Sequence, residues 1–296
     1  KNIVDTSYKN KYKYQVQGNG APVLVGASAA TSDNYIYKDA FVNIGKNAQI
    51  VTSRAQNYNA FSDARLDNAV YSYLWGAIES TDSYAKTDAQ FTNKVNVGEG
   101  AFLKTTAVNR ASDNSSDHSI TLSASDNTES RVFAEVHVAA LLGISSLADA
   151  QNKVVRSNTV TVAKEAFMQS EGDLNLYAGK SQHGGSVLKQ GSYAEGYVTV
   201  INAGVKAKYT METSTNNQVV VEEDAVGKAV KNINLQAIQG NVNIYKMAKE
   251  YRSDDQSSLR QALPKNSTLT ASQNNFVQVD GRLTSGQRNK LVIEIN

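Results

Sequence analysis

The chain has 296 residues, a net charge of +2, two prolines, three methionines and no cysteine. The lack of cysteine excludes disulfide frameworks and thiolate metal sites, and the small net charge creates no strong field that would favour nucleic acid. No apolar run is long enough to predict a membrane span. The abundance of Asn, Ser, Thr, Ala and Val favours a long, thin β-structure over a globule with one thick core.

Residues 8–16 alternate strictly, which is the pattern of a β-strand. Lys9, Lys11 and Lys13 fall on one face of this strand, whereas Tyr8, Tyr12 and Tyr14 fall on the other. Three alternating lysines either protect a strand edge against wrong pairing or contact an anionic surface. We expect the first role.

A strand-turn-strand motif occurs four times along the chain. Its copies are Val42–Ile50, Val95–Leu103, Val160–Met168 and Val219–Val226. The alanines that align in these copies are spaced 53 (101 − 48), 65 (166 − 101) and 59 (225 − 166) residues apart. Spacing of this kind indicates a repeat architecture, in which each unit buries its apolar face against its neighbours.

A second motif follows the first in three of the units, as Ile120–Ala124, Leu174–Ala178 and Ile233–Ala237. The extra residues that separate the two motifs in the second unit predict a loop at 109–117. Helical patterns are limited to 145–153 and 244–252, where one or two turns are expected. Parallel strands of an ordinary α/β fold need crossover helices, so the sequence leaves an antiparallel sandwich or a solenoid.

The repeat favours the solenoid, and we predict an all-β, right-handed parallel β-helix with short loop excursions. With about 20 residues a coil, the chain would form roughly 14 coils, about 65–70 Å long in the stacking direction. Aliphatic residues would fill the bore, Asn and Thr would point outward, and Gly45, Gly98 and Gly172 would occupy corners with positive φ. Residues 1–252 would form four units, at about 15–72, 73–130, 131–195 and 196–252. Residues 253–296 would comprise a polar excursion, at 253–275, and the last strands.

The motifs Val42–Ala48 and Gly172–Ala178, together with Val279–Gly286, resemble the repeats of large secreted Gram-negative exoproteins. The nearest similarity is to leukotoxin-type filamentous adhesins related to filamentous haemagglutinin, and it extends over nearly the whole chain. It implies a secreted or surface-displayed β-helical stalk of a Gram-negative bacterium, with an outer-membrane export partner and a role in adhesion to host cells or their glycans. The family provides no catalytic motif. Ala163 and Glu222 replace the motif glycine, which predicts differently shaped corners.

Residues with metal-binding or catalytic potential are scattered. The three histidines, His118, His137 and His183, lack a second histidine at the spacing of a zinc site, and His137 is expected to point outward from a strand. Loop acids are expected to be solvated and to bind no calcium; they are Asp113, Asp117, Asp126 and Glu129. Neighbouring acids on a strand point to opposite faces, so the runs Glu222–Asp224 and Asp254–Asp255 define no acid pair. We therefore predict no enzyme and no cofactor.

Aromatic residues are concentrated near the N-terminus. Tyr12 with Tyr14, Tyr35 with Tyr37, and Tyr71 with Tyr73 each share one strand face, and Trp75 follows them. Stacked coils would align these side chains in ladders that stiffen the solenoid. The functional alternative is an exposed platform that binds a glycan or a protein partner.

Three functional hypotheses remain. The leading one is a non-enzymatic structural and binding segment of an adhesin, with specificity in the loops at 109–117, 179–192 and 253–275. The second is a carbohydrate-active β-helix, such as a polysaccharide lyase or a tailspike-like depolymerase, and a groove holding two or more carboxylates with an Arg or Lys would favour it. The third is head-to-tail self-association through sheet edges at both ends of the chain, where the sequence looks cut from a longer solenoid.

Overall fold

The computed structural model describes residues 2–5, 8–19, 23–106, 115–143, 146–181, 184–201, 205–252, 267–286 and 288–294. This part of the chain is all-β apart from one short 3-10 helix, η1 (Ser115–His118). It contains no helix of the length and apolar character needed to cross a membrane. The prediction of an all-β chain with parallel strands is confirmed.

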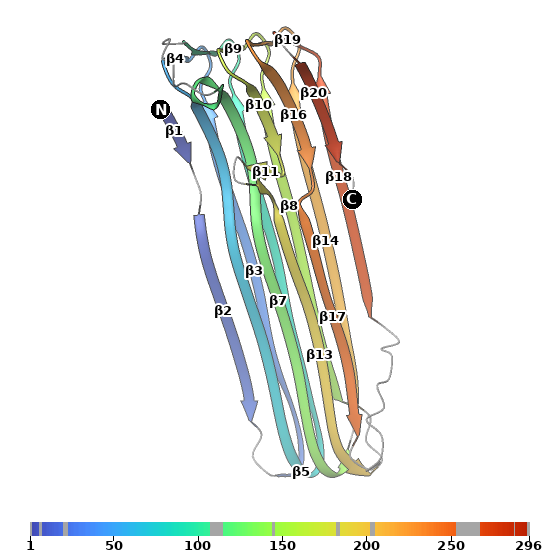
Figure 1. Ribbon diagram of the computed structural model, residues 1–296. Coiled ribbons are helices and arrows are strands. Elements are labelled where there is room, and N and C mark those ends of the chain that lie inside the picture. The colour runs from blue at the N-terminus through green and yellow to red at the C-terminus, as the bar shows by residue number, and fades with distance from the viewer. Residues whose placement is uncertain are drawn as a thin grey trace.

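The long strands form one 13-stranded sheet that folds back on itself through β5 into two halves, and a five-stranded sheet joins the halves at one end (Figure 1). The halves are called the descending and the ascending sheet below, after the direction of their strands in Figure 1, and the five-stranded sheet is called the upper sheet. The descending sheet comprises β1 (Asn2–Asp5), β2 (Tyr8–Asn19), the first half of β5 (Gln56–Val97), β7 (Ile120–Gly143), β10 (Leu174–Ala178), β13 (Val187–Ile201), β16 (Asn232–Ile238), β17 (Asn241–Arg252) and β20 (Arg288–Glu294). The ascending sheet comprises β3 (Val23–Ile44), the second half of β5, β8 (Ser146–Val162), β14 (Val205–Val221) and β18 (Thr268–Val279). The upper sheet comprises β4 (Gln49–Thr52), β6 (Phe102–Thr105), β9 (Phe167–Ser170), β15 (Val226–Ala229) and β19 (Arg282–Ser285).

One repeat unit makes one complete coil. Val42 pairs with Val95, Val95 with Val160, Val160 with Val219, and Val219 with Val277, so each sheet neighbour lies a full repeat away. The expected 20-residue coils, and with them the estimate of roughly 14 coils, are therefore wrong. The described residues form five much larger coils, which stack over only about 24 Å at the usual strand spacing, and the long dimension of the molecule lies along the strands.

Polar segments that resemble turns in the sequence lie inside the long strands, and this makes the coils larger than predicted. Residues 31–34, Thr-Ser-Asp-Asn, lie inside β3, and the two segments with helical patterns lie in strands, β8 and β17. Residues 268–275, expected in an excursion, belong to β18. Residues 253–266 lie outside the described part of the chain.

Four of the five corners between the ascending and upper sheets have the same geometry. In each, an alanine N–H donates to the carbonyl oxygen three residues earlier; the acceptors are Gly45, Gly98, Ala163 and Glu222. The left-handed residue is not the motif glycine but the residue two positions later, which is Asn47, Gly100, Glu165 or Asp224, with φ between 58° and 64°. The predicted positive φ at the motif glycines and the predicted change of shape at Ala163 and Glu222 are thus both wrong.

The space between the two long sheets is filled by apolar clusters separated by polar layers. The first cluster lies under the upper sheet around Leu122 and Leu176, the second surrounds Leu66 and Phe91, and the third surrounds Val136. Polar side chains between them hydrogen-bond to one another, as Ser130 Oγ does to Asn152 Oδ1 across 2.8 Å.

Asparagines form ladders both inside and outside the coils. Outside, Asn96 donates to Asn43 across 2.8 Å, as the sequence predicts. Inside, Asn93 donates to Asn158, and Asn158 to Asn217, each across 2.9 Å. The inner ladder contradicts the prediction that Asn points outward, which rests on the alternation of Asn with aliphatic residues near the corners; Asn93, Asn158 and Asn217 are buried.

A buried ion pair crosses the interior from one long sheet to the other. Arg156 Nη1 of β8 lies 3.1 Å from Asp126 Oδ2 of β7, and both side chains are almost fully buried. Asp126 also accepts hydrogen bonds from Asn158 and Thr128, and Arg156 Nη2 donates to Thr215 across 2.8 Å. The prediction that Asp126 is a solvated loop acid is wrong.

Candidate functional site

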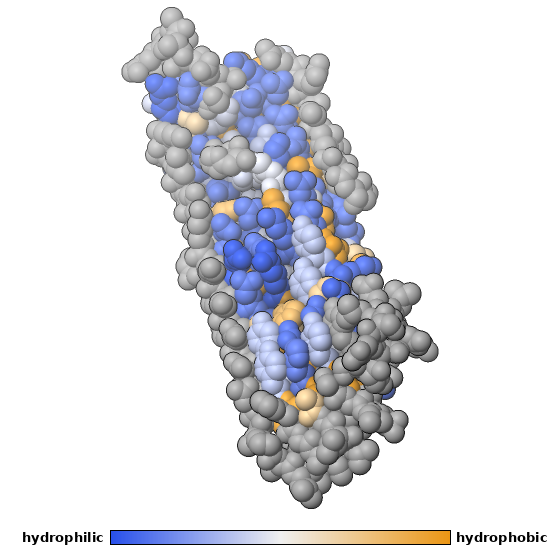
Figure 2. Space-filling model, turned by 60° about the horizontal axis from the view of Figure 1, so that its bottom comes forward, coloured by the Kyte–Doolittle hydropathy of each residue, from blue (hydrophilic) through white to orange (hydrophobic). Residues whose placement is uncertain are grey.

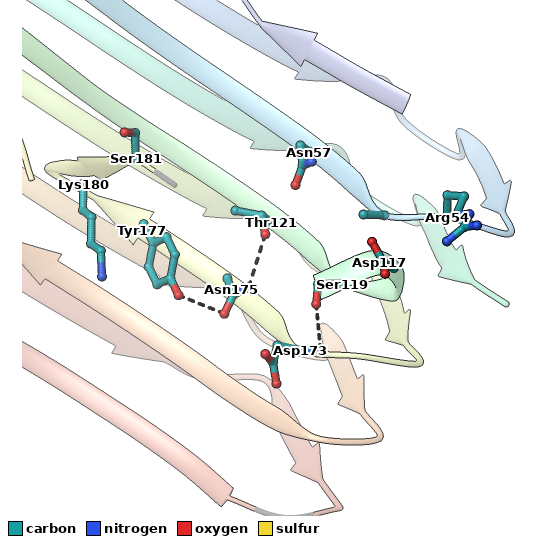
Figure 3. Close-up of a pocket in the computed structure, with 11 residues that line it drawn as sticks. Arg54, Asn57, Asp117, Ser119, Thr121, Asp173, Asn175, Tyr177, Lys180 and Ser181 are labelled. Atoms are coloured by element: carbon teal, nitrogen blue, oxygen red, sulfur yellow. Dashed lines mark hydrogen bonds between the residues drawn. The ribbon is translucent and has the colours of Figure 1, made fainter. Parts of the chain in front are cut away.

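A groove with a volume of about 610 Å³ lies on the outer surface of the descending sheet, near its upper end (Figure 3). The residues that line it come from the loop before β5, η1 and the residues around it, β10 and the excursion that follows β10. They are Arg54, Ala55, Asn57, Asp117, Ser119, Thr121, Asp173, Asn175, Tyr177, Lys180 and Ser181.

The floor of this groove is a row of polar side chains on three adjacent strands. Asn57, Thr121 and Asn175 occupy the same register position in β5, β7 and β10. Asn175 Nδ2 donates to Thr121 Oγ1 across 3.2 Å, and Asn175 Oδ1 accepts from Tyr177 Oη at 2.9 Å and from Asn234 Nδ2 at 2.8 Å. The parallel register therefore fixes the spacing of these amide and hydroxyl groups at one strand separation.

The borders of the groove are the two places where the coils differ most from one another. η1 belongs to the insertion between β6 and β7, which the other coils lack. β11 (Lys180–Ser181) and β12 (Gly184–Gly185) form a small antiparallel hairpin between β10 and β13. The loops at 109–117 and 179–192 are the segments in which specificity is predicted from the sequence, but the sequence does not predict that they border one groove.

Charged groups of both signs line the groove. Asp117 and Arg54 lie toward one end of it, and Lys180 lies near Tyr177 toward the other (Figure 3). Asp173 Oδ1 accepts two hydrogen bonds from Asn232, at 3.0 Å from the backbone N and 2.9 Å from Nδ2. Asp173 thus positions the next coil in addition to lining the groove.

Tyr177 forms part of the wall with its ring. Lys180 Nζ lies over this ring, 4.9 Å from its centroid, and donates to Gln236 Oε1 across 3.1 Å. Burial, and secondarily the Asp173 carboxylate, raises the pKa of Tyr177 to about 12.

This raised pKa predicts a loss of stability at alkaline pH. The folded-state pKa of Tyr177 lies above its ordinary value of 10.0, so its contribution is complete below pH 10 and is lost as the pH rises toward 12. Tyr177→Phe should therefore weaken the pH dependence of the urea midpoint in this interval. Tyr37→Phe, which alters a tyrosine that is 66% exposed, is the control. Equal pH dependence in wild type and Tyr177→Phe would contradict the prediction.

The aromatic residues proposed as a platform do not share one surface. Tyr35 and Tyr37 lie on β3 of the ascending sheet and are 55% and 66% exposed, whereas Tyr71 and Tyr73 lie on the descending sheet. Tyr12 and Tyr14 pair with Leu66 and Asn68, and Trp75 pairs with Ala139; the side chains of these three lie outside the described part. Ligand binding by this set stays a prediction.

Tyr73 belongs to a ladder that the sequence only partly revealed. His137 stacks between Tyr73 and Tyr197, with centroid distances of 4.8 and 4.2 Å, and Glu135 and Glu195 accept from the two tyrosine hydroxyls. His137 points outward, as predicted. Since the rings cover each other's faces, this ladder presents ring edges to the solvent, which suits stiffening better than stacking against a sugar.

The other residues singled out from the sequence are dispersed. Glu222 accepts a hydrogen bond from the backbone N of Lys164 at 3.1 Å, and Asp224 forms a corner. Asp113, His183 and the pair at 254–255 lie outside the described residues, and so do the side chains of Lys9, Lys11 and Lys13. Within the described residues no group of three or more His, Cys, Asp or Glu side chains is arranged to hold a metal ion.

The fold and the groove together define an all-β protein of stacked parallel coils with a polar surface site. Comparison of the chain with protein-family models, curated proteins and solved structures finds no match. The resemblance to filamentous adhesins therefore stays a prediction, and the function has to be argued from the groove.

Proposed function

We propose that this chain is a non-enzymatic segment of a secreted or surface-displayed adhesin, a right-handed β-solenoid that binds glycans in the groove on its descending sheet. The observation that carries the proposal is the position of the groove. Its floor is a rigid ladder, and its borders are the two segments that depart from the repeat. Binding groups held on regular strands are better preorganised than groups on loops.

The lining chemistry supports a polyhydroxylated ligand. Amide, hydroxyl, carboxylate and ammonium groups provide donors and acceptors that alternate over a short distance, and the edge of Tyr177 adds an apolar surface with a polar end. The lining includes two acids, Asp117 and Asp173, and two bases, Arg54 and Lys180, so these side chains carry no net charge and favour no highly charged polymer. Figure 2 shows a face of the molecule on which hydrophilic residues predominate and hydrophobic residues form narrow stripes.

The second candidate function, cleavage of a polysaccharide, is favoured by one observation. The groove holds two carboxylates with an Arg and a Lys, as expected for a carbohydrate-active β-helix. Against it, Asp173 is engaged in two hydrogen bonds from Asn232, which suits a structural acceptor better than a residue that exchanges a proton in each catalytic cycle. We therefore rank binding above cleavage.

A glycan array followed by titration calorimetry tests the proposal. Replacing both Asp117 with Asn and Lys180 with Ala should weaken binding of the glycan selected by wild type at least tenfold, because charge-assisted hydrogen bonds are lost. Lys228→Ala is the matched control, since Lys228 also lies over an aromatic ring, at 5.4 Å from that of Phe167, but away from the groove.

Two outcomes would contradict glycan binding by the groove. One is wild-type protein that selects no glycan, and the other is a double variant that binds as tightly as wild type. Release of new reducing ends or unsaturated products from a bound polysaccharide, abolished by Asp117→Asn, would instead establish cleavage.

A further inference from the structure

The polar row on the floor of the groove continues onto the next coil. Asn57, Thr121 and Asn175 line the groove, and Asn234 of β16 occupies the next position of the same row. Successive members lie one strand separation apart, so the row advances by about 4.8 Å a coil and extends about 14 Å over four coils. The surface therefore repeats a polar contact at a fixed distance along the stacking direction.

The row lies between the two borders of the groove and crosses the strands. Figure 3 shows Arg54 and Asp117 on one side of the row and Lys180 and Ser181 on the other. The borders belong to the segments that depart from the repeat, whereas the row lies on regular strands. A long ligand held between these borders is directed along the row and continues over Asn234.

The row offers hydrogen-bond donors and acceptors to such a ligand. Asn57 lines the groove and is 8% exposed, and its side chain has no hydrogen-bond partner among the described residues. Thr121 Oγ1 accepts from Asn175 across 3.2 Å, and a hydroxyl group that accepts can also donate. Asn234 Nδ2 donates to Asn175 Oδ1 across 2.8 Å. These contacts hold the groups in place before a ligand binds, which lowers the entropic cost of binding.

The spacing of the row distinguishes between classes of linear polymer. A polypeptide strand advances about 3.3 Å a residue and places only every second side chain on one face, which does not match a contact every strand separation. A nucleic acid requires basic groups for its phosphates, but the groove is lined by equal numbers of acids and bases. An extended chain of β-1,4-linked pyranose sugars advances by close to one strand separation a residue and carries hydroxyl groups along its edges.

From these observations we propose that the site takes an uncharged, linear β-1,4-linked polysaccharide, which lies across the strands with one sugar residue on each coil. This inference rests on the proposed function, glycan binding by the groove, and specifies its ligand. The site holds an internal stretch of a long chain rather than a single terminal sugar. It also includes Asn234, which lies outside the groove and contacts the fourth sugar.

Titration calorimetry with β-1,4-linked oligosaccharides of glucose and of N-acetylglucosamine, two to six residues long, tests the proposal. In at least one of the two series the affinity of wild-type protein should rise with each residue up to four. Each step should be at least about threefold, because each added sugar gains a hydrogen bond to the row.

Three variants locate the sugars on the coils. Asn234→Ala should abolish the gain in affinity between three and four residues. Thr121→Val removes a hydroxyl group from the middle of the row at nearly constant volume, and it should weaken binding of both oligosaccharides. Asn274→Ala is the matched control, since Asn274 donates to Asn216 across 3.0 Å in a ladder on the ascending sheet; it should bind both as wild type does. Circular dichroism and the urea midpoint show whether each variant is folded.

The outcomes separate this inference from glycan binding itself. Equal affinity for all lengths would overturn the linear-chain inference, because the groove would then hold a single sugar, but glycan binding would stand. A folded Asn234→Ala that keeps the full gain from the fourth residue would overturn the direction across the strands. If a glycan array selects a ligand but neither series binds, this inference alone fails. If the array selects no glycan, the proposed function fails as well.

Discussion

Asp126→Ala should lower the free energy of unfolding by about 3–5 kcal/mol, the cost of leaving one partner of a buried ion pair uncompensated. The Arg156 guanidinium would lose its partner, which lies 3.1 Å away. Both side chains are buried, so water could not replace the lost carboxylate. Asn158 and Thr128 would lose their acceptor as well. Urea unfolding monitored by circular dichroism measures the change.

Glu129→Ala provides the control on the same strand. Glu129 lies on the outer face of β7, beside Arg65 and Arg131, and an ion pair of this kind contributes less than about 1 kcal/mol. Replacing both members of the buried pair, Asp126 with Ala and Arg156 with Met, should recover part of the loss, because no unpaired charge remains. If Asp126→Ala lowers the free energy of unfolding no more than Glu129→Ala does, the buried ion pair is not the source of the predicted loss.

Gly179→Ala should destabilise the protein by about 2–5 kcal/mol and should disturb the groove. Gly179 has φ of 76°, and an alanine there adds about 1–2 kcal/mol of backbone strain. Its Cβ would also overlap with the Ile238 carbonyl oxygen of the next coil and lie 2.8 Å from Asn217 Cγ. Two coils would have to separate, and overpacking of this kind costs about 1–3 kcal/mol.

Gly184→Ala separates backbone strain from collision. Gly184 also has a positive φ, 139°, but no atom lies within 4 Å of the position of its Cβ. Gly184→Ala should therefore cause backbone strain without a steric clash. Its free energy of unfolding, measured in urea, should fall less than that of Gly179→Ala. If the two variants lose the same stability, contact between coils is not the cause.

Because Gly179 precedes Lys180, Gly179→Ala should also weaken glycan binding, whereas Asp126→Ala should leave binding unchanged in the fraction that stays folded.

The candidate site was only partly predictable. The unequal spacing of two repeated motifs marked the insertion before β7 as a loop, and residues 179–192 were expected to carry specificity. Asn57, Thr121 and Asn175 gave no such signal, since each is an ordinary outward residue of an alternating strand. Knowing that one repeat is one coil brings them together, because residues about 60 positions apart then become neighbours.

The sequence by itself determined the period, the parallel all-β class and the inward aliphatic positions near the corners, because these follow from alternation and self-similarity, which are local properties of the chain. Only the tertiary structure decided the size of a coil and the fate of the polar residues. In the sequence, alternating Asn, Ser, Asp and Arg residues indicate turns or an outer surface. Between the two sheets, however, such side chains hydrogen-bond to one another, as Asp126, Arg156 and Asn158 do. Whether a buried polar group is tolerated depends on the partner that the opposite sheet provides, and that partner is remote in sequence.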